Sequence, residues 1–319
     1  MPVYHWHTHM PDSSSFDKQR IRRNFTRAAP AYDAAAAVNR EICARLLEHL
    51  DLMRLAPEQI LDAGSGTGVA AGMLIRRYPR AQVSAIDLTL AMLRAQPRSG
   101  KWSGTVRAAL GRGALHPICG DFERLPLRSG AMDLVVSNLA LHWSDQPAAA
   151  FAEMLRVLRP GGLLAFTTFG PDTLKELGQA SASAGESTPA HRFIDMHDLG
   201  DLLIRSGFAA PVMEMEYLTL TYARLEDLLR DLRANGALSV RRSRVGLRTP
   251  RWRQRIAQRY EAMRRDGRLP ATLEVVYGHA WKPEEERSHR TSALTREGHA
   301  IVRFERPRRG SSRDPSGRG

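Results

Sequence analysis

The sequence predicts an α/β protein with a mostly parallel sheet of seven strands and helices on both faces. Three observations predict this fold class. Short apolar segments alternate with helical segments along most of the chain, which is typical of parallel sheets. A glycine-rich turn at residues 64–68 joins the first of these strands to a helix. Asp87 and Asp121 end the next two strands, at the edge where open α/β sheets bind their ligands.

The length of 319 residues and the hydrophobic share of 43% fit one α/β domain of about 200–250 residues with added segments. We expect a disordered leader at 1–15, an N-terminal helical lid at 16–56, a central domain at 57–283 and a basic, largely disordered tail at 284–319. The central domain carries an expected insertion on its substrate side, at about 184–270. Long apolar runs and a secretory signal are both lacking, so we expect a cytoplasmic monomer with no membrane contact.

The elements follow from apolar spacing and from turn residues. Val38, Ile42, Leu46 and Leu50 recur at every fourth position, which predicts one helix over 32–55 that ends before Pro57. Strands are predicted at 59–63, 82–86, 117–120, 132–137, 163–169, 212–222 and 272–281. Helices are predicted at 69–77, 90–96, 147–158, 172–183, 197–206, 225–234 and 252–265. A glycine- and arginine-rich loop at 98–113 and a small-residue linker at 181–189 interrupt this order.

The two cysteines, Cys43 and Cys119, are far apart and form no metal motif. We expect both to be small core residues in a reducing compartment. His5, His7 and His9 alternate near the start of the chain. Alternating histidines can bind a metal in an extended strand, but the absence of a core pattern around them favours a disordered leader. We therefore expect no metal cofactor.

The turn after the first strand reads Asp62-Ala63-Gly64-Ser65-Gly66-Thr67-Gly68. Its glycines let the backbone approach a ligand closely. Their spacing is G-x-G-x-G, which differs from the G-x-G-x-x-G of dinucleotide binders, whose pyrophosphate rests on a helix N-terminus. S-adenosyl-L-methionine (SAM) has no phosphate and fits this turn. The predicted cofactor-binding residues here are Asp62, Gly64, Ser65, Gly66 and Gly68, with the Asp62 carboxylate bound to the cationic amino group.

Two further strand ends complete the predicted SAM site. Asp87, with Leu88 beside it, stands where an acid can hold both ribose hydroxyls. Asp121 can accept a hydrogen bond from the adenine amino group, and Phe122 can stack on the ring. An aspartate in the position of Asp121 can also be a simple helix cap.

The fourth strand ends in Ser137-Asn138-Leu139-Ala140-Leu141-His142-Trp143. We expect Asn138 to line the cofactor and the transfer site. His142 is either a base or a packing residue of that site. The Asn-Pro-Pro-Tyr element of nucleic-acid amino-methyltransferases is absent here, and no cysteine nucleophile falls in this region, so we do not expect nucleic-acid bases as substrates.

Several longer elements resemble one family. These are Phe16-Asp17-Lys18-Gln19-Arg20-Ile21-Arg22-Arg23-Asn24-Phe25, Arg27-Ala28-Ala29-Pro30-Ala31-Tyr32-Asp33, the SAM motifs and Phe169-Gly170-Pro171-Asp172-Thr173-Leu174. With segments near His191, Leu269 and Tyr277, they make residues 16–283 similar to the malonyl-[acyl-carrier protein] O-methyltransferases of biotin synthesis, class I SAM-dependent methyltransferases with a Rossmann-like fold. This chain departs from the family's usual residues at Ser65 (often Cys), His142 (often Gln) and His191 (usually Asn).

The resemblance implies methyl transfer from SAM to the free carboxylate of malonyl-acyl carrier protein or malonyl-CoA. The methyl ester then primes synthesis of the pimeloyl chain. A carboxylate with a reference pKa of about 4 needs no base at pH 7, so the site must hold it and exclude water. Arg192 is the predicted carboxylate holder, with a surface arginine as the alternative. Tyr32 orients the carboxylate or anchors the lid, while Asn138 and His142 line the transfer site.

The formal net charge is +13, and residues 241–265 alone contain ten arginines. This stretch can dock the acidic carrier protein that the resemblance implies, or it is a solvated helix face. Three other functions remain open from the sequence: an RNA or other small-acid methyltransferase, a respiratory-complex assembly factor or hydroxylase with the same fold, and a SAM-binding module without catalysis.

Overall fold

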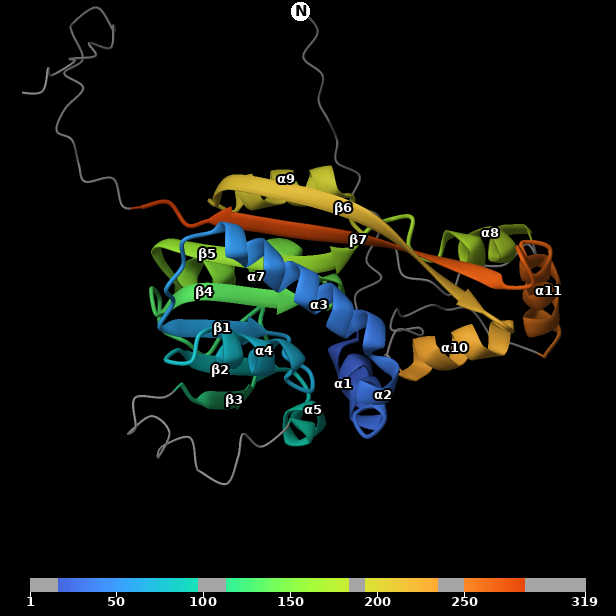
Figure 1. Ribbon diagram of the computed structural model, residues 1–319, viewed down its shortest axis with the longest axis horizontal. Coiled ribbons are helices and arrows are strands. Elements are labelled where there is room, and N and C mark those ends of the chain that lie inside the picture. Colours follow the sequence, from blue (N-terminus) through green and yellow to red (C-terminus); the bar gives the residue numbers. More distant parts are fainter. Residues whose placement is uncertain (1–16, 97–112, 184–192, 235–249, 285–319) are drawn as a thin grey trace, which may run out of the picture. The chain divides into compact units, whose positions relative to one another are not determined.

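The computed structural model describes residues 17–96, 113–183, 193–234 and 250–284. These segments contain a seven-stranded sheet with the order β3-β2-β1-β4-β5-β7-β6 (Figure 1). Its strands are β1 (Gln59–Ala63), β2 (Gln82–Asp87), β3 (Leu115–Cys119), β4 (Met132–Asn138), β5 (Leu158–Phe169), β6 (Ala209–Tyr222) and β7 (Leu269–Trp281). The strands β1 to β5 are parallel, and β7 is antiparallel to β5 and β6. The predicted mostly parallel, seven-stranded sheet is confirmed.

Several predicted features lie outside the described residues. They are the leader at 1–15, nearly all of the loop at 98–113, most of the linker at 181–189, Arg192, the arginines at 241–248 and the tail from residue 285. The predicted insertion at 184–270 includes β6, which forms the edge of the sheet beside β7. No helix in the described ranges has the length and apolar character needed to cross a membrane.

The order of the strands changes direction at β1. The strands β2 and β3 lie on one side of β1, and β4 lies on the other. At such a switch point the connections leave the sheet on opposite faces, and a crevice opens at the carboxyl ends of the strands. The helices α1 (Lys18–Ala28), α2 (Tyr32–Ala35) and α5 (Leu90–Ala95) lie together beyond these strand ends (Figure 1). This arrangement places the candidate site under the N-terminal helices.

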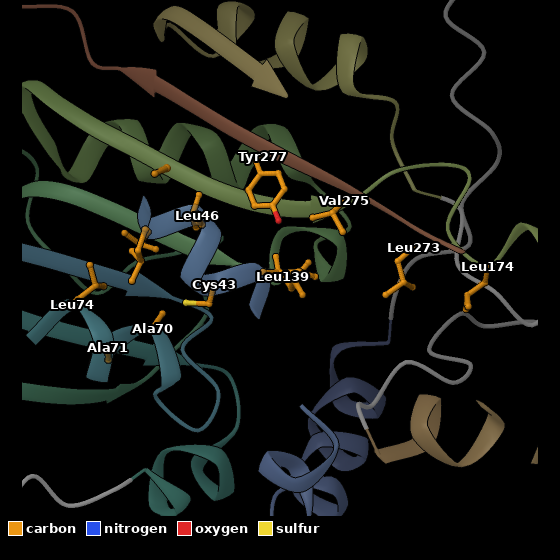
Figure 2. Packing of buried hydrophobic residues seen from close by; sticks show 14 of the residues in the cluster. Cys43, Leu46, Ala70, Ala71, Leu74, Leu139, Leu174, Leu273, Val275 and Tyr277 are labelled. Carbon is orange, nitrogen blue, oxygen red and sulfur yellow. The ribbon is translucent and has the colours of Figure 1, made fainter. Parts of the chain in front are cut away.

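Helices cover both faces of the sheet, each over its own hydrophobic core. One core joins the sheet to α3 (Ala37–His49), α4 (Val69–Arg77) and α8 (Lys175–Ser183), and the other joins it to α7 (Pro147–Val157) and α9 (Met196–Arg205). Figure 2 shows Cys43 and Leu46 of α3 packed near Ala70 and Leu74 of α4. The alternating strand residues that fill these two cores give the helix–sheet–helix layers that the sequence predicts.

The N-terminal helix differs from the prediction of one continuous helix over 32–55. It divides at Ala36 into α2 and α3, and a 3-10 turn, Leu50–Leu52, follows α3. Tertiary bonds hold α2 apart: the Thr67 hydroxyl donates to the Asp33 carboxylate at 2.5 Å, and Arg40 donates to the Asp33 carbonyl at 2.5 Å. The spacing of apolar residues contains no sign of these bonds, so the prediction of a single helix was wrong.

The prediction for the two cysteines is confirmed for one and wrong for the other. Cys43 is fully buried in α3, whereas Cys119 is exposed. Cys119 ends β3, the outermost strand beside β2, and an edge strand covers fewer of its side chains. Burial, with the nearby Asp62 charge, raises the pKa of the Cys43 thiol to about 12.

Polar bonds connect α3 to the two antiparallel strands. Arg45 lies 2.6 Å from a Glu216 carboxylate oxygen of β6, and the Tyr277 hydroxyl of β7 donates to the other Glu216 oxygen at 2.5 Å. Burial, together with Glu216, raises the pKa of Tyr277. With the buried stripe of α3, these bonds fix this helix to the sheet.

The turn after β5 is held by β7. A Cβ atom on Gly170 would lie 2.3 Å from the Glu274 carboxylate, so a larger residue there would force the Glu274 side chain to move. The same carboxylate accepts a hydrogen bond from the Asp172 backbone at 2.6 Å, and Thr173 donates to the Glu274 carbonyl at 3.1 Å. Leu174 takes a left-handed backbone conformation with φ +58°. These contacts give a structural reason for the Phe-Gly-Pro-Asp-Thr-Leu element.

Candidate active site

A cavity lies between the strand ends of the switch point and the inner side of α1, and its empty space, part of which is open solvent, is about 680 Å³. The predicted site residues in its wall are Tyr32, Gly64, Gly66, Asp87, Leu88, Asp121, Phe122 and Asn138. The structure thus brings together residues from the lid, the glycine-rich turn and three strand ends.

The glycine-rich turn has one packed side and one open side. A Cβ atom on Gly64 would lie 2.2 Å from the Cβ of Ala140, whereas a Cβ atom on Gly66 would meet no atom within 4 Å. Both glycines have positive φ angles, +83° and +52°, which other residues rarely adopt. The backbone at Gly66 is therefore accessible from the cavity.

Asp62 lies under this turn and not in the cavity wall. Its carboxylate is 1% exposed, and one oxygen accepts a hydrogen bond from the Ala71 backbone at 2.9 Å, in the first turn of α4. Its other oxygen has no hydrogen-bond partner among the described residues. Burial raises the pKa of Asp62 to about 7, although the Ala71 bond opposes this shift. Asp62 thus accepts a backbone hydrogen bond at the start of α4, and its second carboxylate oxygen remains a buried acceptor without a donor among the described residues.

Ser65 and Gly68 are also absent from the cavity wall. Ser65 is buried and accepts a hydrogen bond from the Gln96 side chain at 3.1 Å, and Gln96 donates to the Gly66 carbonyl at 3.2 Å. A Cβ atom on Gly68 would lie 3.0 Å from the Gln96 side chain. These contacts give Ser65 and Gly68 a supporting position behind the turn.

Asp87 is held in place at the end of β2. Its two carboxylate oxygens accept hydrogen bonds from the Gly66 backbone at 2.9 Å and from the Thr89 backbone at 2.7 Å. Burial raises the pKa of Asp87, and the bonds from Thr89 and Gly66 oppose this shift. Each oxygen keeps a free lone pair, so the carboxylate can accept further hydrogen bonds from a pair of hydroxyls.

Asp121 forms an ion pair with a residue of the lid. Lys18 of α1 lies 2.5 Å from Asp121 and also forms an ion pair with Glu123. Burial lowers the pKa of Lys18, but its bonds to Asp121 and Glu123 outweigh this and raise it. Phe122 lies in the cavity wall next to Asp121. The lid therefore reaches the place that the sequence predicts for adenine.

Tyr32 enters the cavity from α2. Its hydroxyl accepts a hydrogen bond from the Asn39 side chain at 3.2 Å, so the proton of the hydroxyl remains available for an acceptor in the cavity. Burial is the main cause that raises the pKa of Tyr32, which keeps the hydroxyl protonated. The Phe25 ring lies 6.3 Å from that of Tyr32 and 5.4 Å from that of Trp143. Tyr32 is thus both an aromatic anchor and a possible donor.

Asn138 is fixed by bonds to two segments, α3 and β5. Its amide donates to the Asn39 carbonyl at 3.2 Å, and its oxygen accepts from the Thr167 hydroxyl of β5 at 2.8 Å. The Leu139 backbone donates to the Thr167 hydroxyl at 2.9 Å, in a left-handed conformation with φ +50°. Asn39 therefore connects Tyr32 to the ends of β4 and β5.

His142 does not line the cavity that holds Tyr32 and Asn138. Its ring packs 5.2 Å from Phe169, 5.6 Å from Phe193 and 4.9 Å from Trp143. Its surroundings match the packing alternative more closely than the base. Arg192 lies outside the described residues, directly before Phe193 in the chain.

The sequence analysis did not assign to the site several polar residues that position it, among them Lys18, Asp33, Asn39 and Thr167. Each acts through a partner that is between 7 and 103 positions away in the sequence. The only local signal is that Asp33 directly follows Tyr32. Among the described residues, no group of three or more His, Cys, Asp or Glu side chains is arranged to hold a metal ion.

Comparisons with known proteins agree with this site. The family model described as a methyltransferase domain matches residues 61–166. Malonyl-[acyl-carrier protein] O-methyltransferase of Laribacter hongkongensis is 51% identical over 86% of this chain and 92% of its own length. The protein of the same name from Methylovorus sp. is 48% identical over 86% of this chain and 92% of its own length.

Solved structures show the fold. A protein of Bacillus halodurans described as a methyltransferase has a TM-score of 0.52 with 21% identity, covering 76% of this chain and 98% of its own. YcgJ of Bacillus subtilis has the same TM-score with 15% identity, covering 75% and 98%. These likenesses support the class I methyltransferase architecture.

Proposed function

Because the chain belongs to the malonyl-[acyl-carrier protein] O-methyltransferase family, we propose that it transfers the methyl group of SAM to the free carboxylate of a malonyl group on acyl carrier protein. The single observation that carries this proposal is the identity of 51% to such a protein, which extends over 86% of this chain and 92% of that relative. The product is a methyl ester without the charge of the carboxylate, which would serve as the primer of the pimeloyl chain in biotin synthesis.

The residues present fit SAM. The backbone at Gly66 is open to the cavity, and Asp62 has a buried acceptor with no partner among the described residues. An unpaired buried acceptor is unfavourable, and a cationic amino group would satisfy it. Asp87 would hold the ribose hydroxyls, and Asp121 with Phe122 would hold the adenine. SAM supplies an electrophilic methyl group when it is bound.

The acceptor carboxylate needs positioning and not activation. With a reference pKa of about 4 it is ionised at pH 7. The hydroxyl of Tyr32, protonated and oriented by Asn39, is placed to donate to it. Asn138 has a second amide hydrogen beyond the one bound to Asn39, which can turn to the same acceptor. These two donors would hold the carboxylate in line for attack.

The aromatic rings near the transfer site would exclude water. Phe25 and Trp143 line the cavity, and His142, Phe169 and Phe193 form a cluster beside it. A dry site strengthens the hydrogen bonds to the carboxylate and strips its hydration shell. We keep Arg192 as the proposed carboxylate holder because it precedes Phe193 of this cluster in the chain.

The test is transfer of labelled methyl from SAM to malonyl-acyl carrier protein, with malonyl-CoA and bulk tRNA as parallel acceptors. We expect base-labile label on the malonyl carrier and none on tRNA. Label on tRNA alone would replace the proposal by an RNA methyltransferase. SAM binding without label on any acceptor would contradict methyl transfer to malonyl groups.

A further inference from the structure

The helix α1 has two faces of opposite character. Lys18, Ile21 and Phe25, spaced by three and four residues, line the cavity, and Ile21 is only 4% exposed. Arg23 and Arg27 are four residues apart and exposed. Residues three or four apart share one side of a helix, so the outer side of α1 carries these arginines while its inner side closes the SAM site.

The two exposed arginines on the outer face of α1, Arg23 and Arg27, have little neutralising charge near them among the described residues. The helix contains Lys18, Arg20, Arg22, Arg23 and Arg27 and no acidic residue. In the part of the chain that the structure describes, Arg27 forms no ion pair, and Arg23 has only a 4.0 Å contact with Asp17. The side chain of Arg23 is 65% exposed. Such groups are available to an acidic partner.

The position of α1 matters because a carrier protein holds its acyl group on an arm. The carrier body remains outside while the malonyl group enters the cavity, so the carrier must dock at the mouth. The helix α1 lies at the carboxyl ends of the strands, next to α5 (Figure 1), and Arg22 donates to the Leu88 carbonyl of the cavity wall at 3.3 Å. Because residues of α1 line the cavity, we expect the outer face of this helix to lie near the entrance.

We propose that the outer face of α1, with Arg23 and Arg27, is the docking surface for the acidic acyl carrier protein. This inference rests on the proposed function and names the surface that receives its partner. It differs from the prediction that the arginines of 241–265 dock the carrier. The described part of that stretch, α11 (Pro250–Glu261), packs against α8, and none of its residues lines the cavity.

The test compares two acceptors that differ only in the carrier. One is malonyl-acyl carrier protein, and the other is malonyl-N-acetylcysteamine, which has the same thioester and carboxylate but neither protein nor phosphate. The variant is Arg23→Glu with Arg27→Glu. We expect the KM for the carrier substrate to rise about tenfold or more at low salt, since like charges then face the carrier. The kcat/KM for the small thioester and the affinity for SAM should stay within about twofold.

The matched control is Arg255→Glu with Arg259→Glu on α11, which reverses two exposed arginines at the same spacing. We expect no change in the KM for the carrier substrate. The neutral pair Arg23→Gln with Arg27→Gln should give an intermediate rise, which separates charge from helix disruption.

Each alternative outcome has a distinct meaning. Equal loss with both acceptors would overturn the docking surface and assign the arginines to lid closure. A rise in KM for the α11 pair alone would move docking to α11. No methyl transfer by the unaltered protein to either acceptor would instead contradict the proposed function itself.

Discussion

The hydroxyl of Tyr32 can donate into the cavity because Asn39 donates to it. Removing either side chain should weaken the hold on the acceptor carboxylate. We expect Tyr32→Phe and Asn39→Leu each to lower kcat/KM about tenfold or more, because a hydrogen bond to a charged group contributes about 1.5–3 kcal/mol and about 1.4 kcal/mol is a factor of ten. The double variant should lose little more than the worse single variant, because the two groups act as one unit. Steady-state kinetics with malonyl-N-acetylcysteamine measures this.

The control for this pair is the affinity for SAM, which should change less than about twofold. The Asn39 carbonyl that binds Asn138 belongs to the backbone, so it survives the substitution. Fully additive losses in the double variant would show that Tyr32 and Asn39 act separately.

In its proposed role as the partner of the SAM amino group, Asp62 should make SAM binding depend on pH. Burial raises the pKa of Asp62 from its ordinary value of 3.8 to about 7, so the folded protein holds this proton more tightly than the unfolded chain. The contribution of protonated Asp62 to the free energy of unfolding is therefore complete below about pH 4 and is lost as the pH rises to about 7. The carboxylate that forms above pH 7 attracts the cationic amino group of SAM. We expect the affinity for SAM to rise about tenfold between pH 6 and 8, measured by isothermal titration calorimetry.

The variant Asp62→Asn should bind SAM more weakly at pH 8 and with little dependence on pH. An amide can still accept the Ala71 hydrogen bond, so α4 should keep its start. An unchanged pH profile in this variant would assign the dependence to another group, such as Asp87.

Among the elements, the turn after β5 has a steric requirement that can be tested by one methyl group. Gly170→Ala places a Cβ atom against the Glu274 carboxylate, which also holds Asp172. We expect a loss of about 1–3 kcal/mol in the free energy of unfolding, measured by urea denaturation.

Gly72→Ala is the matched control: Gly72 lies inside α4 with no atom nearer than 3.8 Å to its Cβ position. That change should stabilise the protein by about 0.5–1 kcal/mol. Equal effects at both sites would remove the steric argument.

The sequence predicts the elements well where the signal is local. The strand β1 has the same bounds in sequence and structure, and so does α4. Strands β5 and β7 begin earlier than predicted, at Leu158 and Leu269, because pairing between neighbours extends them beyond their apolar centres. The division at Ala36 depends on Asp33 binding to Thr67, and no local pattern encodes a bond across 34 positions.

The predicted site shows the same limit. The glycines and the acids at strand ends could be found because they follow strands in a fixed order. The positions of Ser65 and Gly68 behind the turn depend on Gln96, a residue with no signal of its own. His142 lies close to a strand end, as Asn138 does, so the sequence treats the two residues alike. Only the packing of side chains in the folded protein places His142 in an aromatic cluster.

For the whole molecule, the net charge of +13 predicts that salt affects the two acceptors differently. Exposed charges are screened over about 10 Å at 0.1 M salt. We expect kcat/KM for malonyl-acyl carrier protein to fall about tenfold between about 0.02 and 0.3 M sodium chloride, since steering by charge weakens. The value for malonyl-N-acetylcysteamine should stay within about twofold. Parallel falls for both acceptors would show that salt acts on the reaction and not on the encounter.

The bonds from Arg45 to Glu216 and from Tyr277 to Glu216 have a consequence for how a ligand enters. They bind α3 to β6 and β7, so α3 cannot move without breaking its packing in the hydrophobic core. Ala36 is the first residue before that fixed helix and has a non-helical backbone, with φ −93° and ψ 25°. We expect ligand entry to move α1 and α2 about Ala36 while α3 stays in place. Such a movement would break the bond from Thr67 to Asp33 and the ion pairs of Lys18 with Asp121 and Glu123, and it would expose Ile21.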